Sequence, residues 1–150
     1  MQKLEARYGK IENEKWNDES KWMTIFNIPN EIGFWINTIT SKPTKKIYCN
    51  RDLIGPLNIA LKNVIDNGLK GELRTFDGCF MIRAQRGTTD TPSMHSYGIA
   101  IDLNARLNPL GADPVMLPEF VKCWTDAGWT WGGNFKRKDG MHFEYTAKVA

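Results

Sequence analysis

The chain has 150 residues, of which 41% are hydrophobic, a composition typical of one globular domain that buries roughly two thirds of its unfolded surface. Its 20 basic and 17 acidic residues are interspersed and give a net charge of +3, which argues against a nucleic-acid-binding patch. No apolar run approaches the roughly 18 residues of a membrane span, and no N-terminal signal peptide is recognisable. We therefore expect one domain over residues 1–150, made in a cytoplasm and without stable membrane insertion.

The first half of the chain predicts short elements followed by one long helix. A short helix is expected within the charged first twenty residues, and an apolar segment at 22–28 ends at Pro29. From residue 53 the apolar positions follow one helical face, and Gly68 is a plausible end of this helix. These positions are Leu53, Leu57, Ala60, Leu61 and Val64.

The second half combines strand signals with a second helix. Residues 71–80 favour strand and turn, with Asp77-Gly78 as a tight turn. A helix is predicted from Pro118 to about Gly128, with one apolar face formed by Phe120, Val121, Trp124 and Ala127. With further strands around residues 99–103 and 141–145, the pattern indicates an α+β fold, in which a small antiparallel sheet carries the functional residues and helices pack on one side.

The cysteines and tryptophans are interpreted mainly as core residues. Three widely spaced cysteines form no C-x-x-C pair, so free, buried thiols are expected. They are Cys49, Cys79 and Cys123. Trp124, Trp129 and Trp131 are expected in the core, with Trp131 also a candidate for lining a cleft, because it precedes two glycines.

Only two histidines occur in the chain, and each lies in a short segment with a carboxylate. In the predicted strand 99–103, alternation places Asp102 on the face opposite Ile101 and its apolar neighbours. In the strand 141–145 the same rule places His142 and Glu144 opposite Phe143. If these strands are neighbours, Asp102 and His142 meet on one face. The turn before Gly98 then places His95 beside them.

Two imidazole nitrogens and one carboxylate oxygen form a typical ligand set for Zn²⁺ and leave a fourth position for water. Such a site hydrolyses bonds when a base handles the proton of the attacking water. Asp139, three residues before His142, is the candidate base. Glu144 is its rival, because it shares the predicted face of His142.

These segments resemble a known family of peptidoglycan peptidases, the zinc D-Ala-D-Ala carboxypeptidases and L-alanyl-D-glutamate endopeptidases. Family members show S-x-H-x-x-G-x-A-x-D, then W-G-G, then D/E-x-x-H. The matching residues here are Ser93, His95, Gly98, Ala100, Asp102, Trp131, Gly132, Gly133, Asp139 and His142. Residues 78–83 are also similar to the family's G-x-x-x-x-R segment, so the resemblance runs from about residue 45 to 146.

The resemblance implies a role for each matched residue. It places Zn²⁺ on His95, Asp102 and His142 and the acid/base function on Asp139. It also implies that Arg83 engages the substrate or the developing oxyanion, with Arg86 as a second candidate for that role. Glu144 is interpreted as a residue that supports a ligand or faces solvent, and it is not counted among the catalytic residues.

The small size of the chain and the absence of a wall-binding module look most like the single-domain phage endolysins of this family. That likeness implies a monomer that hydrolyses the L-Ala-D-Glu bond of the peptidoglycan stem peptide in the periplasm, reached through a separate holin-like pore. Two alternatives stay open: a D-Ala-D-Ala carboxypeptidase, or a metal-bearing module that binds the wall without cutting it. The first forty residues match nothing in the family.

Overall fold

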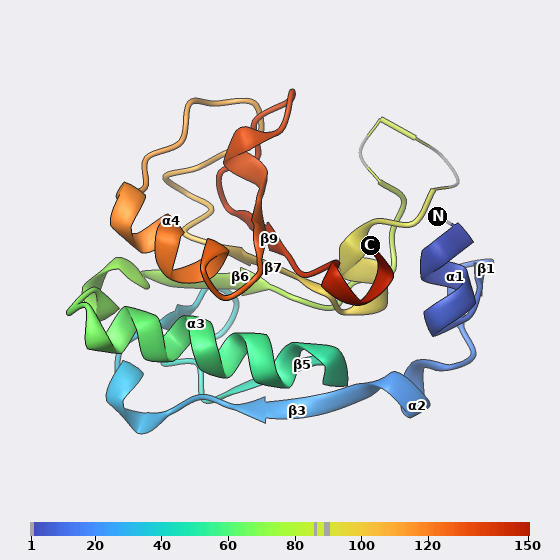
Figure 1. The fold of residues 1–150 in the computed structure, drawn as a ribbon, viewed down its shortest axis with the longest axis horizontal. Coiled ribbons are helices and arrows are strands. Elements are labelled where there is room, and N and C mark those ends of the chain that lie inside the picture. The colour runs from blue at the N-terminus through green and yellow to red at the C-terminus, as the bar shows by residue number, and fades with distance from the viewer. Residues whose placement is uncertain (1, 86, 89–90) are drawn as a thin grey trace.

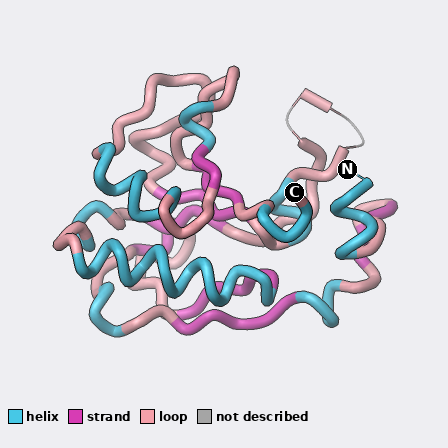
Figure 2. The backbone as a smooth tube through the Cα atoms, viewed as in Figure 1, coloured by secondary structure: helices cyan, strands magenta, loops and turns pink. Residues whose placement is uncertain are grey.

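The computed structural model describes residues 2–85, 87–88 and 91–150 and has the α+β architecture predicted from the sequence (Figure 1). The α-helices are α1 (Gln2–Tyr8), α2 (Glu19–Trp22), α3 (Ile54–Asp66) and α4 (Pro118–Thr125). The strands are β1 (Ile11–Glu12), β2 (Lys15–Trp16), β3 (Met23–Asn27), β4 (Ile36–Asn37), β5 (Lys46–Asn50), β6 (Thr75–Gly78), β7 (Ala100–Leu103), β8 (Thr130–Trp131) and β9 (His142–Glu144). Short 3₁₀ turns are η1 (Asn30–Ile32), η2 (Arg51–Leu53), η3 (Lys70–Glu72), η4 (Met94–Tyr97), η5 (Gly132–Asn134) and η6 (Ala147–Val149). Loops connect most of these elements (Figure 2).

The largest sheet has the strand order β4-β6-β7-β9-β8. Strands β6, β7, β9 and β8 pair in antiparallel fashion, whereas β4 joins the edge of β6 in parallel. The predicted antiparallel arrangement is therefore found in the four strands that include those of Asp102 and His142. Two smaller antiparallel pairs, β1–β2 and β3–β5, form outside this sheet.

Helix α3 occupies the position predicted from its apolar pattern. Figure 1 shows it between the five-stranded sheet and the β3–β5 pair. Its inward side chains are fully buried, namely Leu57, Ala60, Leu61 and Val64. The chain leaves the helix through Gly68, whose φ of +68° is readily adopted only by glycine.

Helix α4 also agrees with the prediction and supports strand β9 from the core side. Pro118 is its first residue, where a missing N–H costs nothing, and Gly128 follows the helix with φ of +95°. The buried Trp124 ring lies 5.1 Å from the Phe143 ring of β9, measured between centroids. Because alternate residues of a strand face opposite ways, this packing directs His142 and Glu144 away from the core.

The predicted tight turn at Asp77-Gly78 is wrong, because both residues belong to β6. Gly78 pairs with Asp102, and the register shifts between Phe76 and Gly78, as in a β-bulge. Asp77 accepts hydrogen bonds from the Thr75 hydroxyl (2.8 Å) and the Ala105 amide (2.9 Å). Asp-Gly here forms a bulge within the sheet. The chain that follows β6 then runs beside η4, where the Met81 amide donates to the His95 carbonyl (3.1 Å).

The three cysteines are free and buried, as predicted. Burial raises the pKa of the Cys49 thiol to about 12, so this side chain behaves as a core residue. None of the described helices has the length and apolar character needed to cross a membrane.

Candidate metal centre

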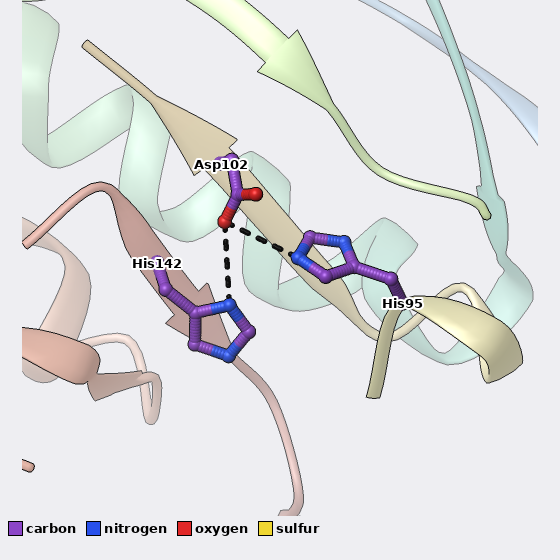
Figure 3. Close-up of side chains that lie close together, drawn as sticks. All are labelled: His95, Asp102 and His142. Carbon is purple, nitrogen blue, oxygen red and sulfur yellow. Dashed lines mark hydrogen bonds and ion pairs between the residues drawn. The ribbon is translucent and has the colours of Figure 1, made fainter. Parts of the chain in front are cut away.

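Three side chains from separate segments meet above the sheet: His95, Asp102 and His142 (Figure 3). Each offers one potential ligand atom, and these atoms all lie within 4.8 Å of one another. The Asp102 Oδ1 atom is 3.2 Å from His95 Nε2 and 3.3 Å from His142 Nδ1. The structure thus brings together the three residues that the sequence analysis assigned to a metal; their role as ligands stays a prediction.

Strand pairing places Asp102 and His142 opposite each other. Strands β7 and β9 are antiparallel, and Asp102 is the register partner of His142. The neighbouring residues Ile101 and Phe143 are fully buried on the other face. One buried face on each strand therefore fixes the register that joins the carboxylate to the imidazole.

His95 reaches the same point from the short turn η4. Gly98 ends this turn in the left-handed conformation, with φ of +67°. A Cβ atom at Gly98 would lie only 2.6 Å from the Met23 sulfur, so no larger residue fits without displacing Met23. The glycine of the sequence motif thus allows the turn to pack on β3 while it presents His95.

The two nitrogens of His95 have different environments. Nδ1 lies 2.7 Å from the Cys79 carbonyl oxygen, so Nδ1–H donates to this carbonyl and Nε2 carries the lone pair. Among the described residues, Nε2 is buried without a hydrogen-bond partner, although the Asp102 carboxylate lies 3.2 Å away. A buried imidazole lone pair without a donor, facing a carboxylate and a second imidazole, fits a divalent cation such as Zn²⁺.

The electrostatics of the cluster favour bound positive charge. Burial alone would raise the pKa of Asp102, but the hydrogen bond with His142 and the close contact with His95 outweigh burial and lower it below its ordinary value. For His142, burial would lower the pKa, but Asp102 and Glu144 raise it to about 9. Asp102 is therefore an anion at neutral pH, and the carboxylates around His142 stabilise a cation at this point.

A pocket of about 430 Å³ opens onto the cluster. Its wall consists of Arg83, Gln85, Ser93, Met94, His95, Leu110, Phe135, Arg137, Asp139, His142 and Glu144. Asp139 and Arg83, the candidate catalytic residues, thus share one pocket with both histidines. Arg86, the second candidate for the arginine role, lies outside the described residues.

The backbone of Arg83 is tied to the turn that carries His95. The Arg83 amide donates to the Ser96 hydroxyl oxygen (2.9 Å), and that hydroxyl donates to the Arg83 carbonyl (2.8 Å). Ser96 itself is fully buried in η4. These two hydrogen bonds fix the position of the Arg83 backbone relative to His95.

Asp139 is placed by a close backbone approach at Gly132. The Asp139 amide donates to the Gly132 carbonyl (2.9 Å), and the His142 amide donates to the Asp139 carbonyl (3.0 Å). A Cβ atom at Gly132 would collide with the Asp139 carbonyl oxygen and lie 3.1 Å from the His142 Cβ. The first glycine of the W-G-G motif therefore permits the turn from Asp139 to His142 to pack closely against Gly132.

Sequence reasoning did not identify the whole pocket wall. Phe135, whose ring centroid is 5.9 Å from that of His142, and Arg137 both line the pocket, as does Leu110. The available sequence signal was a phenylalanine directly before the polar segment that leads to Asp139. Trp131 is not among the lining residues; its ring stacks on Phe143, and its Nε1 donates to the Gly140 carbonyl (2.9 Å).

A family model described as D-alanyl-D-alanine carboxypeptidase matches residues 86–145. No curated protein and no solved structure shows significant similarity to the chain. The matched segment contains His95, Asp102, Asp139 and His142, whereas Arg83 precedes it. The family match and the His-Asp-His cluster together identify residues 86–145 as a segment similar to the zinc peptidases of the D-Ala-D-Ala carboxypeptidase family.

Proposed function

We propose that the protein is a zinc-dependent peptidoglycan peptidase that hydrolyses the L-Ala-D-Glu bond of the stem peptide. The observation that carries this proposal is the convergence of His95, Asp102 and His142 next to a pocket whose wall contains both histidines and Asp139. The similarity of residues 86–145 to a peptidase family supports the same reaction class.

The proposed ligands are His95 Nε2, Asp102 and His142 Nδ1, because these atoms face one another. Zinc in such a three-ligand site supplies a Lewis acid that polarises a carbonyl and makes water nucleophilic at neutral pH. Its binding requires both imidazoles to be neutral, since a protonated nitrogen has no lone pair to donate.

Asp139 is the proposed general base and acid. Its carboxylate would accept the proton of the attacking water and then deliver that proton to the departing amine. The hydrogen bonds of its backbone to Gly132 and His142 hold it at a constant place in the pocket wall. A base on a fixed backbone needs little rearrangement when the substrate binds.

Arg83 and Arg137 place two guanidinium groups in the pocket wall and support an anionic peptide as the substrate. Within the described ranges, neither arginine lies within ion-pair distance of a carboxylate, unlike Arg7 and Arg74 elsewhere on the surface. The stem peptide carries free carboxylates, which two guanidinium groups can bind. Arg83 is the proposed partner of the substrate or of the negative charge that develops on the carbonyl oxygen.

The biological role proposed here is that of a monomeric phage endolysin that acts on the wall in the periplasm. A separate holin-like pore would give it access across the inner membrane. The description of the matching family favours a second candidate, a D-Ala-D-Ala carboxypeptidase, which would use the same centre. A non-catalytic wall-binding module is less consistent with Asp139 in the pocket.

Mass spectrometry of digested, purified peptidoglycan tests these candidates. The endopeptidase releases stem peptides that begin at D-Glu, whereas a carboxypeptidase releases single D-alanine residues. Both products must disappear with a chelator and return with zinc. A zinc-loaded protein that binds the wall but releases neither product would refute the enzymatic proposal.

A further inference from the structure

Glu144 holds a fixed place in the sheet next to the candidate metal centre. Strand β9 lies between β7 and β8, and Glu144 has a register partner on both sides, Ala100 in β7 and Thr130 in β8. It is two residues after His142 and therefore projects from the same face of the strand. Both side chains line the pocket.

The Glu144 carboxylate contacts the nitrogen of His142 that faces away from Asp102. Glu144 Oε1 is 2.8 Å from His142 Nε2, whereas Asp102 Oδ1 is 3.3 Å from His142 Nδ1. The contact is largely shielded from water, since the exposed fractions of the His142 and Glu144 side chains are 9% and 17%. In the part of the chain that the structure describes, no lysine or arginine pairs with this carboxylate.

His95 is held in a comparable way. Its Nδ1–H donates to the Cys79 carbonyl, and its Nε2 points to the cluster. Each imidazole thus has an oxygen acceptor at the nitrogen remote from the cluster. A neutral imidazole carries one N–H, so the remote acceptor determines which nitrogen keeps its lone pair.

We propose that Glu144 is a positioning residue that accepts the Nε2–H hydrogen bond of His142 and thereby directs the Nδ1 lone pair to the cation. This inference rests on the metal centre of the proposed function. It assigns Glu144 a different role from Asp139, because an oxygen of the Glu144 carboxylate is engaged by the imidazole. The general base is then Asp139 alone.

Zinc affinity of two variants tests this role directly. Glu144→Ala removes the acceptor and is expected to weaken zinc binding by about 10- to 100-fold, the range for lost carboxylate partners of metal-bound histidines. Glu144→Gln keeps an acceptor oxygen and is expected to recover most of that loss. The measurement is competition against a chromophoric chelator, and Glu31→Ala is the control, since Glu31 is exposed on η1 outside the pocket.

The outcomes separate positioning from catalysis. Wild-type zinc affinity in Glu144→Ala would overturn the proposal. The proposal would also be overturned if Glu144→Gln bound zinc normally but lost hydrolysis as severely as Asp139→Ala, because that result assigns the base role to Glu144. The zinc affinities can be measured even if the wild-type protein cleaves no peptidoglycan. Failure of the positioning role of Glu144 can therefore be distinguished from failure of the proposed function.

The wild-type protein provides a second measurement if Glu144→Ala does not fold. Ring ¹⁵N shifts of the zinc-loaded protein report which nitrogen of His142 carries the proton. We expect the proton on Nε2, coupled to a hydrogen bond with Glu144. A proton on Nδ1 would contradict the proposal.

Discussion

Two aspartates of this protein show how similar electrostatics can have different uses. Asp52 accepts hydrogen bonds from the Arg7 guanidinium at 2.8 and 3.0 Å and from the Tyr8 hydroxyl at 2.7 Å. Asp102 is instead shared between two imidazoles, at 3.2 and 3.3 Å. In both cases burial would raise the pKa of the carboxyl, and hydrogen-bonding partners lower it below its ordinary value.

The partners, rather than the pKa shift, distinguish a structural cluster from a functional one. A guanidinium has donors only and does not release its proton, so the Arg7–Asp52 pair can only hold α1 against η2. An imidazole that loses its proton becomes a metal ligand. The carboxylate of Asp102 can therefore exchange its histidine contacts for a cation, whereas the carboxylate of Asp52 cannot.

Loss of a proposed metal ligand should have the largest effect on the Asp102 cluster. His95→Ala removes one of three donor groups, so we expect the purified variant to lose bound zinc and all measurable hydrolysis. Metal analysis and peptidoglycan digestion provide the measurements. Asp52→Asn serves as the control from the other cluster and should keep its zinc. Full zinc content and turnover in His95→Ala would remove His95 from the metal centre.

Asp139→Ala should give the next largest effect and separates catalysis from metal binding. We expect it to retain zinc while turnover falls about 10²- to 10⁴-fold, the usual contribution of a general acid or base. The matched control is Asp113→Ala, since Asp113 is an exposed carboxylate that pairs with Lys138 near the same loop. Cleavage of peptidoglycan by Asp139→Ala at the wild-type rate would show that the base is another group.

The parts of the molecule that follow local rules could be predicted from the sequence. Helix α3 has a clear apolar face, and the alternation in β7 and β9 predicts which side of the sheet carries Asp102 and His142. Antiparallel pairing of those two strands then joins the residues. By contrast, Asp77-Gly78 was misinterpreted because the same dipeptide suits a turn and a bulge, and only the pairing of β6 with β7 distinguishes them.

Contacts between distant segments could not be predicted in this way. Arg7 and Asp52 are 45 positions apart, and neither lies in a motif that indicates the pair. The place of Phe135 and Arg137 in the pocket wall depends on the loop whose Phe135 and Asp139 amides both donate to the Gly132 carbonyl. Such placement follows from tertiary packing, for which a single sequence has no periodic signal.

Asp52→Asn tests the Asp52 cluster through the stability of the protein instead of its activity. We expect the free energy of unfolding to fall by about 1.5–3 kcal/mol, the range for hydrogen bonds to a charged group, with no loss of zinc. Urea unfolding with metal analysis measures both properties. Asp66→Asn is the control, because Asp66 forms an exposed pair with Lys62 worth less than about 1 kcal/mol. An equal effect of the two variants would show that the Asp52 cluster is no more than a surface ion pair.

The smallest expected effect is the pH dependence of that stabilisation. The pKa of Asp52 is lowered in the folded state, so the unfolded chain, with a pKa of about 3.9, binds the proton more readily. The contribution of Asp52 is therefore complete above about pH 5 and decreases as the pH falls through the unfolded pKa and then the folded pKa. The difference in unfolding free energy between wild type and Asp52→Asn, measured without metal, should decrease over this acidic range. Asp102 and His142 titrate in both proteins and cancel in the difference, so a difference that stays constant with pH would contradict the assignment to Asp52.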